Sequence, residues 1–172
     1  WVKDRLRERG LRPRKGLGQH FLVDREALNN LLAAAQIHPE DIVLEVGPGL
    51  GLITRELALR ADRVIAVEVD PLLAAQLKES VTTTSRVEVV NADILQFDPG
   101  SISSPSYKLV ATLPYYIATA VVRHFLETDF KPSVMVVTLQ EEVAENMVAP
   151  PGRMGLLSVM TQLYGTPQII SR

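Results

Sequence analysis

The chain has 172 residues, of which 47% are hydrophobic and 22% are charged, and its formal net charge is −2. These values predict one globular domain with a substantial core. No apolar run is long enough to cross a membrane and no secretory signal is visible, so we expect a cytoplasmic protein. Cysteine is absent, which excludes disulfides and thiolate metal sites, and the three histidines lack the spacing of metal ligands.

Charge is distributed unevenly along the chain. Residues 1–16 hold seven basic and two acidic side chains, a net charge of +5, whereas the remaining residues carry −7. A basic arm on an acidic body is typical of a protein that meets an anionic partner at one end. A solvated terminal segment explains the charge equally well. We therefore expect a basic arm over residues 1–16 and a folded domain over residues 17–172.

Apolar residues alternate between helical and strand spacing along the chain. Helices are predicted over 24–35 with Asp24 as N-cap, over 52–59, from Pro71 onward, and over 117–127, 140–147 and 155–164. Strands are predicted over 42–46, 63–68, 86–90, 107–111, 133–139 and 166–171. In the helix that begins at Pro71, the residues expected to face inward are Leu72, Leu73, Ala75 and Leu77. This alternation predicts an α/β fold with a mostly parallel sheet and helices on both faces.

A glycine-rich turn separates the first predicted strand from the helix that follows it. The acid Glu45 precedes Gly47, Gly49 and Gly51, so the turn reads E-x-G-x-G-x-G. The dinucleotide fingerprint would instead need Gly or Ala at Leu52, which disfavours a nicotinamide-linked oxidoreductase. The observed form is the one found in S-adenosylmethionine-dependent methyltransferases. A purely structural glycine turn is the alternative interpretation.

Acids also follow the second and third predicted strands. Glu68 lies seventeen residues past Gly51, where its carboxylate can accept both hydroxyls of a ribose. Asp93 can accept a hydrogen bond from an exocyclic amine, and Ala92 offers apolar contact to a ring. The alternatives are an exposed charge at a strand end and a simple turn aspartate.

The segment from Thr112 to Tyr116 follows the fourth predicted strand, at the sheet edge where α/β folds bind ligands. Pro114 stiffens this segment and leaves the carbonyl of Leu113 free to accept a hydrogen bond. The paired tyrosines can stack on a flat base. A helix start with aromatic residues in the core fits the same pattern.

Five motifs occur in one order: 18–22 (GQHFL), 45–51 (EVGPGLG), Glu68, 91–93 (NAD) and 113–117 (LPYYI). With them, residues 12–172 resemble the small-subunit ribosomal RNA adenine dimethyltransferases, relatives of the erythromycin-resistance rRNA methylases. The resemblance implies a Rossmann-like class I methyltransferase fold. It also implies methyl transfer from S-adenosylmethionine to N6 of two adjacent adenosines near the 3′ end of small-subunit rRNA, during small-subunit maturation. The implied partner is this rRNA or a pre-30S-type particle, and we expect a monomer.

The resemblance also implies which residues form the site. Those that would contact the cofactor are Gln19, His20, Leu22, Glu45, Gly47, Gly49, Gly51, Glu68, Val69, Ala92, Asp93 and Thr112. Those that would hold the target base, flipped out of its stack, are Thr112, Leu113, Pro114 and Tyr115. The amine would attack the sulfonium methyl group directly, so no metal is needed and placement supplies most of the acceleration.

The chain departs from the family pattern in two ways. Thr112 stands where the family has Asn, and losing one hydrogen bond to the target amine would cost roughly 1–3 kcal/mol, or about ten- to a hundredfold in rate. The family's Phe-x-Pro-x-Pro segment, final antiparallel strand and C-terminal helical domain do not follow Arg172. We therefore expect this chain to bind the cofactor and to bind rRNA only weakly.

Two interpretations of this departure stay open. The chain is either the catalytic domain of a dimethyltransferase with reduced activity, or a cofactor-binding rRNA assembly factor with weak or no catalysis. For the basic arm, the resemblance favours contact with rRNA over simple solvation.

Overall fold

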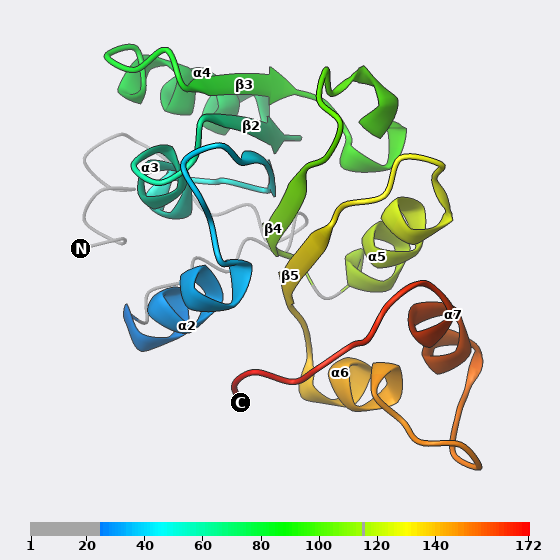
Figure 1. Ribbon diagram of the computed structural model, residues 1–172. Coiled ribbons are helices and arrows are strands. Elements are labelled where there is room, and N and C mark those ends of the chain that lie inside the picture. The colour runs from blue at the N-terminus through cyan, green and yellow to red at the C-terminus, as the bar shows by residue number, and fades with distance from the viewer. Residues whose placement is uncertain (1–24, 115) are drawn as a thin grey trace.

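The computed structural model describes residues 25–114 and 116–172. At their centre lies a five-stranded sheet whose strand order is β3-β2-β1-β4-β5 and whose neighbouring strands are all parallel. The strands are β1 (Ile42–Val46), β2 (Arg63–Glu68), β3 (Val87–Asn91), β4 (Lys108–Thr112) and β5 (Val134–Thr138). The chain moves outward from β1 to β3 and then returns to the other side of β1 (Figure 1). Sheets with such a reversal bind ligands at the carboxyl ends of the strands beside it, here β1 and β4.

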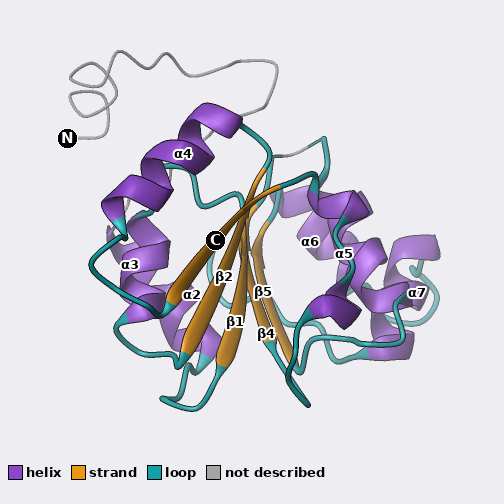
Figure 2. Ribbon diagram, turned by 90° about the horizontal axis from the view of Figure 1, so that it is seen from above, coloured by secondary structure: helices purple, strands orange, loops and turns teal. Residues whose placement is uncertain are grey.

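Helices cover both faces of the sheet (Figure 2). One face carries α2 (Arg25–Ala35), α3 (Leu52–Ala58) and α4 (Pro71–Ser80), and the other carries α5 (Ala118–Glu127), α6 (Glu141–Met147) and α7 (Leu156–Tyr164). Alternate strand residues therefore enter different cores, because successive side chains of a strand point to opposite faces. Val43 packs with the residues of α2 and α3, whereas its neighbour Leu44 packs with those of α5. The predicted α/β architecture is confirmed.

Two expectations about these elements were wrong. Residues 166–172 form no strand; Ser171 instead accepts a hydrogen bond from Asn30 of α2, and Arg172 pairs with acids of α6. An apolar pattern cannot by itself supply the neighbouring strand that a ladder needs. The helix α4 buries Leu73, Ala74 and Leu77, while Leu72 and Ala75 are exposed, because packing on β2 and β3 sets its rotation. The expected N-cap, Asp24, lies outside the described residues.

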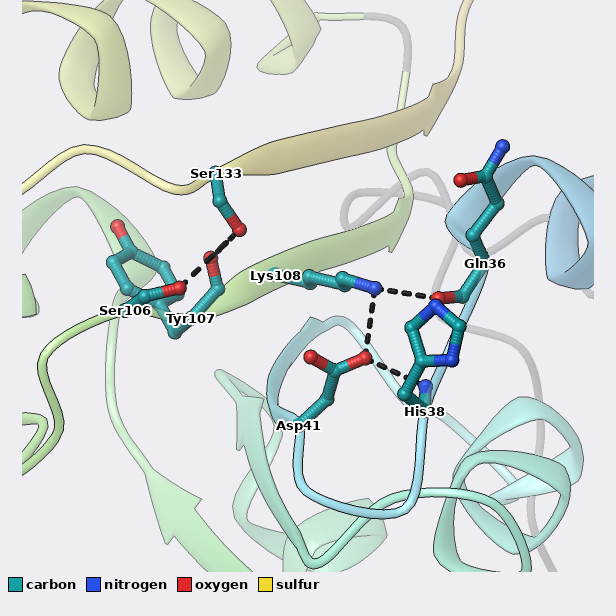
Figure 3. A network of polar contacts seen from close by, with 7 residues as sticks. All are labelled: Gln36, His38, Asp41, Ser106, Tyr107, Lys108 and Ser133. Carbon is teal, nitrogen blue, oxygen red and sulfur yellow. Dashed lines mark hydrogen bonds and ion pairs between the residues drawn. The ribbon is translucent and has the colours of Figure 1, made fainter.

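A polar network lies at the amino edge of the sheet, by which we mean the side at which the parallel strands begin (Figure 3). Lys108, at the start of β4, pairs with Asp41 at 2.7 Å and also donates to the carbonyl of Gln36, just after α2. Asp41 accepts a further bond from the His38 N–H at 2.6 Å. The network thereby ties α2, the approach to β1 and β4 together. Among the described helices, none is long and apolar enough to cross a membrane.

Candidate functional site

The glycine turn connects β1 to α3. It lies at the carboxyl edge of the sheet, by which we mean the side at which the parallel strands end. Gly47, Gly49 and Gly51 have φ values of 68°, 55° and 75°, a region that side-chain-bearing residues rarely adopt. A Cβ at Gly51 would lie 2.4 Å from Cδ1 of Leu77, so any larger residue would force the Leu77 side chain to shift on α4. A Cβ at Gly47 would instead face the Thr112 carbonyl at 3.8 Å, which places the ends of β1 and β4 side by side.

Glu68 joins this turn to the end of β2. Its side chain is only 5% exposed, and its two oxygens accept bonds from the N–H groups of Gly49 and Asp70, each at 3.0 Å. Burial raises the pKa of the Glu68 carboxyl, although these two hydrogen bonds work in the opposite direction. The Val69 N–H also faces this carboxyl and lowers its pKa in part. A carboxylate offers about four acceptor positions, so Glu68 keeps acceptor capacity for a hydroxyl group beyond these backbone contacts.

Glu45 lies below the turn and is 1% exposed. Among the described residues, none makes a well-aligned hydrogen bond to either of its carboxyl oxygens. Burial is the main reason that the pKa of Glu45 rises to about 8; the neighbouring Thr54 hydroxyl lowers it in part, and the Glu68 carboxyl raises it. Thr54 Oγ1 is itself buried without a hydrogen bond of acceptable geometry. The folded chain thus keeps Glu45 protonated near neutral pH.

The end of β3 forms the next part of the edge. The Ala92 N–H donates to the Glu68 carbonyl at 3.2 Å, which places the loop after β3 against the end of β2. One oxygen of Asp93 accepts from the Leu95 N–H at 3.0 Å and so caps the short 3-10 helix Ile94–Gln96. Its carboxylate keeps acceptor positions beyond that bond. Val69, which follows Glu68, is 51% exposed and gives the edge an apolar surface.

The end of β4 completes the arrangement. Thr112 is the last residue of β4 and is level with Thr138 of β5. Leu113 is buried, and the carbonyl of Pro114 accepts from the Ile117 N–H at 3.1 Å as the chain enters α5. Tyr116 is 66% exposed. The segment after β4 is therefore anchored by Leu113 and presents an aromatic ring to solvent.

Parallel register brings most of the predicted residues together. Val46 is level with Val67 and with Ala111, so the residues that follow these three lie at one height along the carboxyl edge. They are Gly47, Glu68 and Thr112. The predicted residues Gln19, His20, Leu22 and Tyr115 lie outside the described residues.

Three residues of the site received no role of their own from the sequence, although Asn91 lies within the motif 91–93. Asp70 caps α4 by accepting from the Leu72 N–H at 2.9 Å, and its own N–H binds Glu68. Its position before Pro71 is a recognisable capping signal. Thr54 faces Glu45, and Asn91 binds the backbone after β2; no sequence pattern points to either contact.

These residues fit a nucleoside better than a metal ion. Within the described ranges, no group of three His, Asp or Glu side chains could hold a metal. A glycine turn that admits a ligand to the backbone, a buried carboxylate with spare acceptor positions and a second carboxylate on the next strand suit ribose hydroxyls and an amine. Fold and site together define the class of nucleoside-cofactor-binding α/β enzymes to which class I methyltransferases belong.

Comparison with solved structures supports this class. The crystal structure of the 23S rRNA methyltransferase ErmE is 38% identical, with a TM-score of 0.72 over 83% of this chain and 57% of ErmE. A dimethyladenosine transferase from Plasmodium falciparum is 26% identical, with a TM-score of 0.73 over 84% of this chain and 52% of that one. The fold is that of a class I methyltransferase.

Sequence comparison gives the family. The model for the ribosomal RNA adenine dimethylase family matches residues 10–171, and the chain belongs to this family. The Dehalococcoides mccartyi protein named ribosomal RNA small subunit methyltransferase A is 49% identical over 172 residues, covering 99% of this chain and 59% of that protein. The Moorella thermoacetica protein of the same name is 42% identical, covering 96% and 62%. The chain thus spans about three fifths of these relatives' length.

Proposed function

We propose that this chain is the catalytic domain of an S-adenosylmethionine-dependent rRNA adenine-N6 dimethyltransferase. Its substrate would be two adjacent adenosines near the 3′ end of small-subunit rRNA. Family membership supports this, as does the common name of relatives at 42–49% identity. The observation that carries the proposal is Glu68, a buried carboxylate bonded to the glycine turn with acceptor positions left for a ribose.

The cofactor contacts follow from these positions. Glu68 would accept the ribose hydroxyls, and Asp93 would accept the adenine amine beside the apolar surface of Val69 and Ala92. Gly47 would let the methionine part approach the backbone between β1 and β4, with Glu45 and Gly49 close by. Gly51 acts indirectly, because it lets the turn pack on α4. When bound, S-adenosylmethionine supplies an electrophilic methyl group.

The substrate contacts lie on the segment after β4. The Leu113 carbonyl and the Thr112 hydroxyl would accept the hydrogens of the adenine amine and orient its lone pair. Pro114 would hold this carbonyl in place, since its φ is restricted. Tyr115 would stack on the flipped base. The chain would supply acceptors and placement, and the proton that the methylated amine loses would pass to water.

The basic arm, residues 1–16, and the domain, residues 17–172, would have different roles. We propose that the basic arm contacts rRNA within a pre-30S-type particle and that the domain acts as a monomer in the cytoplasm. Removing residues 1–14 should weaken RNA binding and reduce the slope of log affinity against log salt, because fewer phosphates are neutralised. An unchanged slope would contradict the role of the arm.

Calorimetry with S-adenosylmethionine tests the cofactor site. We expect binding by the wild-type chain and at least a tenfold loss in Glu68→Gln, which keeps the size of the side chain but loses acceptor capacity. The matched control is Glu88→Gln, an exposed acid on β3 that pairs with Arg63 at the opposite edge. Binding of a nicotinamide dinucleotide in place of S-adenosylmethionine would overturn the proposal.

Methyl transfer to unmodified small ribosomal subunits tests the reaction. Thr112→Asn should raise the rate by about ten- to a hundredfold if a carboxamide restores a hydrogen bond to the target amine. If neither wild type nor Thr112→Asn transfers methyl groups in a version that carries the family's C-terminal helical domain, while both bind cofactor, the protein would instead act as a binding factor.

A further inference from the structure

Asn91 is the last residue of β3, which lies at the end of the strand order and pairs with β2 among the described strands. Its side-chain amide donates to the Glu68 carbonyl at 2.7 Å and to the Val69 carbonyl at 3.3 Å. A carboxamide has two N–H donors, so the side chain can satisfy both carbonyls. The contact links the end of β3 to the backbone that leaves β2.

That backbone carries the proposed ribose contact. The Glu68 carbonyl accepts from the Ala92 N–H as well as from Asn91, while the Glu68 carboxylate holds the N–H groups of Gly49 and Asp70. The peptide on the far side of Val69 is held by the second Asn91 bond. Asn91 therefore restrains the backbone on both sides of Val69, next to the carboxylate.

The proposed cofactor contacts come from two different strands. Glu68 ends β2, whereas Ala92 and Asp93 follow β3. The ladder between these strands is regular up to the pair Glu68 and Asn91 and ends there. Beyond it, the Ala92 N–H bond and the two Asn91 bonds hold the two strand ends at a set distance. Loss of these bonds would alter the distance between the Glu68 carboxylate, which is the proposed acceptor for the ribose, and the Asp93 carboxylate, which is the proposed acceptor for the adenine.

We infer that Asn91 is a positioning residue for the cofactor, which sets the spacing between the contacts of the ribose and those of the adenine. The inference rests on the proposed function. Asn91 needs no contact with the cofactor; it acts by keeping the Glu68–Val69 backbone and the loop after β3 in their binding arrangement. Such preorganisation improves affinity because less ordering is needed on binding.

Asn91→Asp tests this role with almost no change in shape. The aspartate loses both donors and places a carboxylate against two carbonyl oxygens. We expect about a tenfold loss of affinity for S-adenosylmethionine in calorimetry, and a similar loss in Asn91→Ala. Glu88→Gln is the matched control, because Glu88 also links β3 to β2, at the opposite edge of the same strand pair. It should change thermal stability without changing cofactor affinity.

A double-mutant cycle separates positioning from general stability. If Asn91 acts through Glu68, the loss caused by Asn91→Asp should shrink in a Glu68→Gln background, whereas independent effects would add. Wild-type affinity in both Asn91→Asp and Asn91→Ala, or full additivity in the cycle, would overturn the inference and leave the proposed function intact. Failure of the wild-type chain itself to bind S-adenosylmethionine would overturn both.

Discussion

Ionisable side chains have different partners at the two edges of the sheet. At the amino edge, Lys108 is paired with Asp41 and with a carbonyl, so the charged groups neutralise one another (Figure 3). At the carboxyl edge, Glu45 and Glu68 are both buried, and Glu68 is held by backbone N–H groups alone among the described hydrogen bonds. The ion pair at the amino edge therefore stabilises the fold. The carboxyl edge keeps polar groups available for a ligand at the expense of stability.

The pKa values follow the same division. Burial works to raise the pKa of Asp41, yet Lys108 and the His38 N–H outweigh it and hold that pKa below its usual value. Burial raises the pKa of both Glu45 and Glu68. The Asp41 contribution to stability is therefore lost as pH falls through its folded pKa, whereas the Glu45 and Glu68 contributions are lost as pH rises.

The largest expected effect is the pH dependence caused by Glu45. The unfolded chain ionises this carboxyl near 4.5 and the folded chain near 8, so the folded state binds more protons between these values and its stability falls as pH rises. Across this full range, the free energy of unfolding should fall by roughly 5 kcal/mol because of this carboxyl. Glu45→Gln should make the free energy of unfolding, measured in urea at pH 5, 6.5 and 8, much less dependent on pH. The exposed Glu56→Gln is the control, and equal pH slopes in both variants would contradict the account.

Lys108→Met should produce the next largest change, this time at the amino edge. It leaves Asp41 and the Gln36 carbonyl without their cationic partner, at a cost of about 3 kcal/mol in the free energy of unfolding. Adding Asp41→Asn should recover part of the loss, since the two residues are coupled. Affinity for S-adenosylmethionine should stay unchanged in the folded variant. A large loss of affinity would show that the two edges are not independent.

Gly51→Ala should cost about 2 kcal/mol of stability. The new Cβ would meet Leu77, which is 2% exposed and cannot easily move, and the φ of 75° adds strain. Gly152→Ala is the matched control, because φ there is 90° but no atom lies within 4 Å of the added Cβ. It should cost about 1 kcal/mol. Equal losses in chemical denaturation would mean that backbone strain alone matters at Gly51.

The smallest effect is expected from a surface ion pair that belongs to neither edge. Arg123 and Glu127 are one turn apart on α5 and are both exposed. Arg123→Gln should change the free energy of unfolding by about 0.3–0.5 kcal/mol, and less at high salt. A change as large as that of Lys108→Met would contradict the account in which the Lys108–Asp41 pair stabilises more than the Arg123–Glu127 pair because it is buried.

Local sequence patterns were sufficient for most of the fold. All five strands of the sheet lie within one residue of their predicted bounds, because short runs rich in β-branched apolar residues and bounded by turn residues favour strands. The glycine turn and Asp70-Pro71 likewise carry their structural meaning in the residues themselves, through positive φ and helix capping. The sequence alone thus determined the α/β class, the parallel sheet and the edge at which a ligand would bind.

Only the tertiary structure decided what each side chain meets. It exposed Leu72, left residues 166–171 without a neighbouring strand, and bound Asn91 to the carbonyls of Glu68 and Val69. It also buried Glu45 with no well-aligned hydrogen-bond partner in the part of the chain that the structure describes. These outcomes depend on strands and helices that are far apart in the chain. A residue's own type and its near neighbours determine its backbone, but its burial and its partners are set by whichever element the fold packs against it.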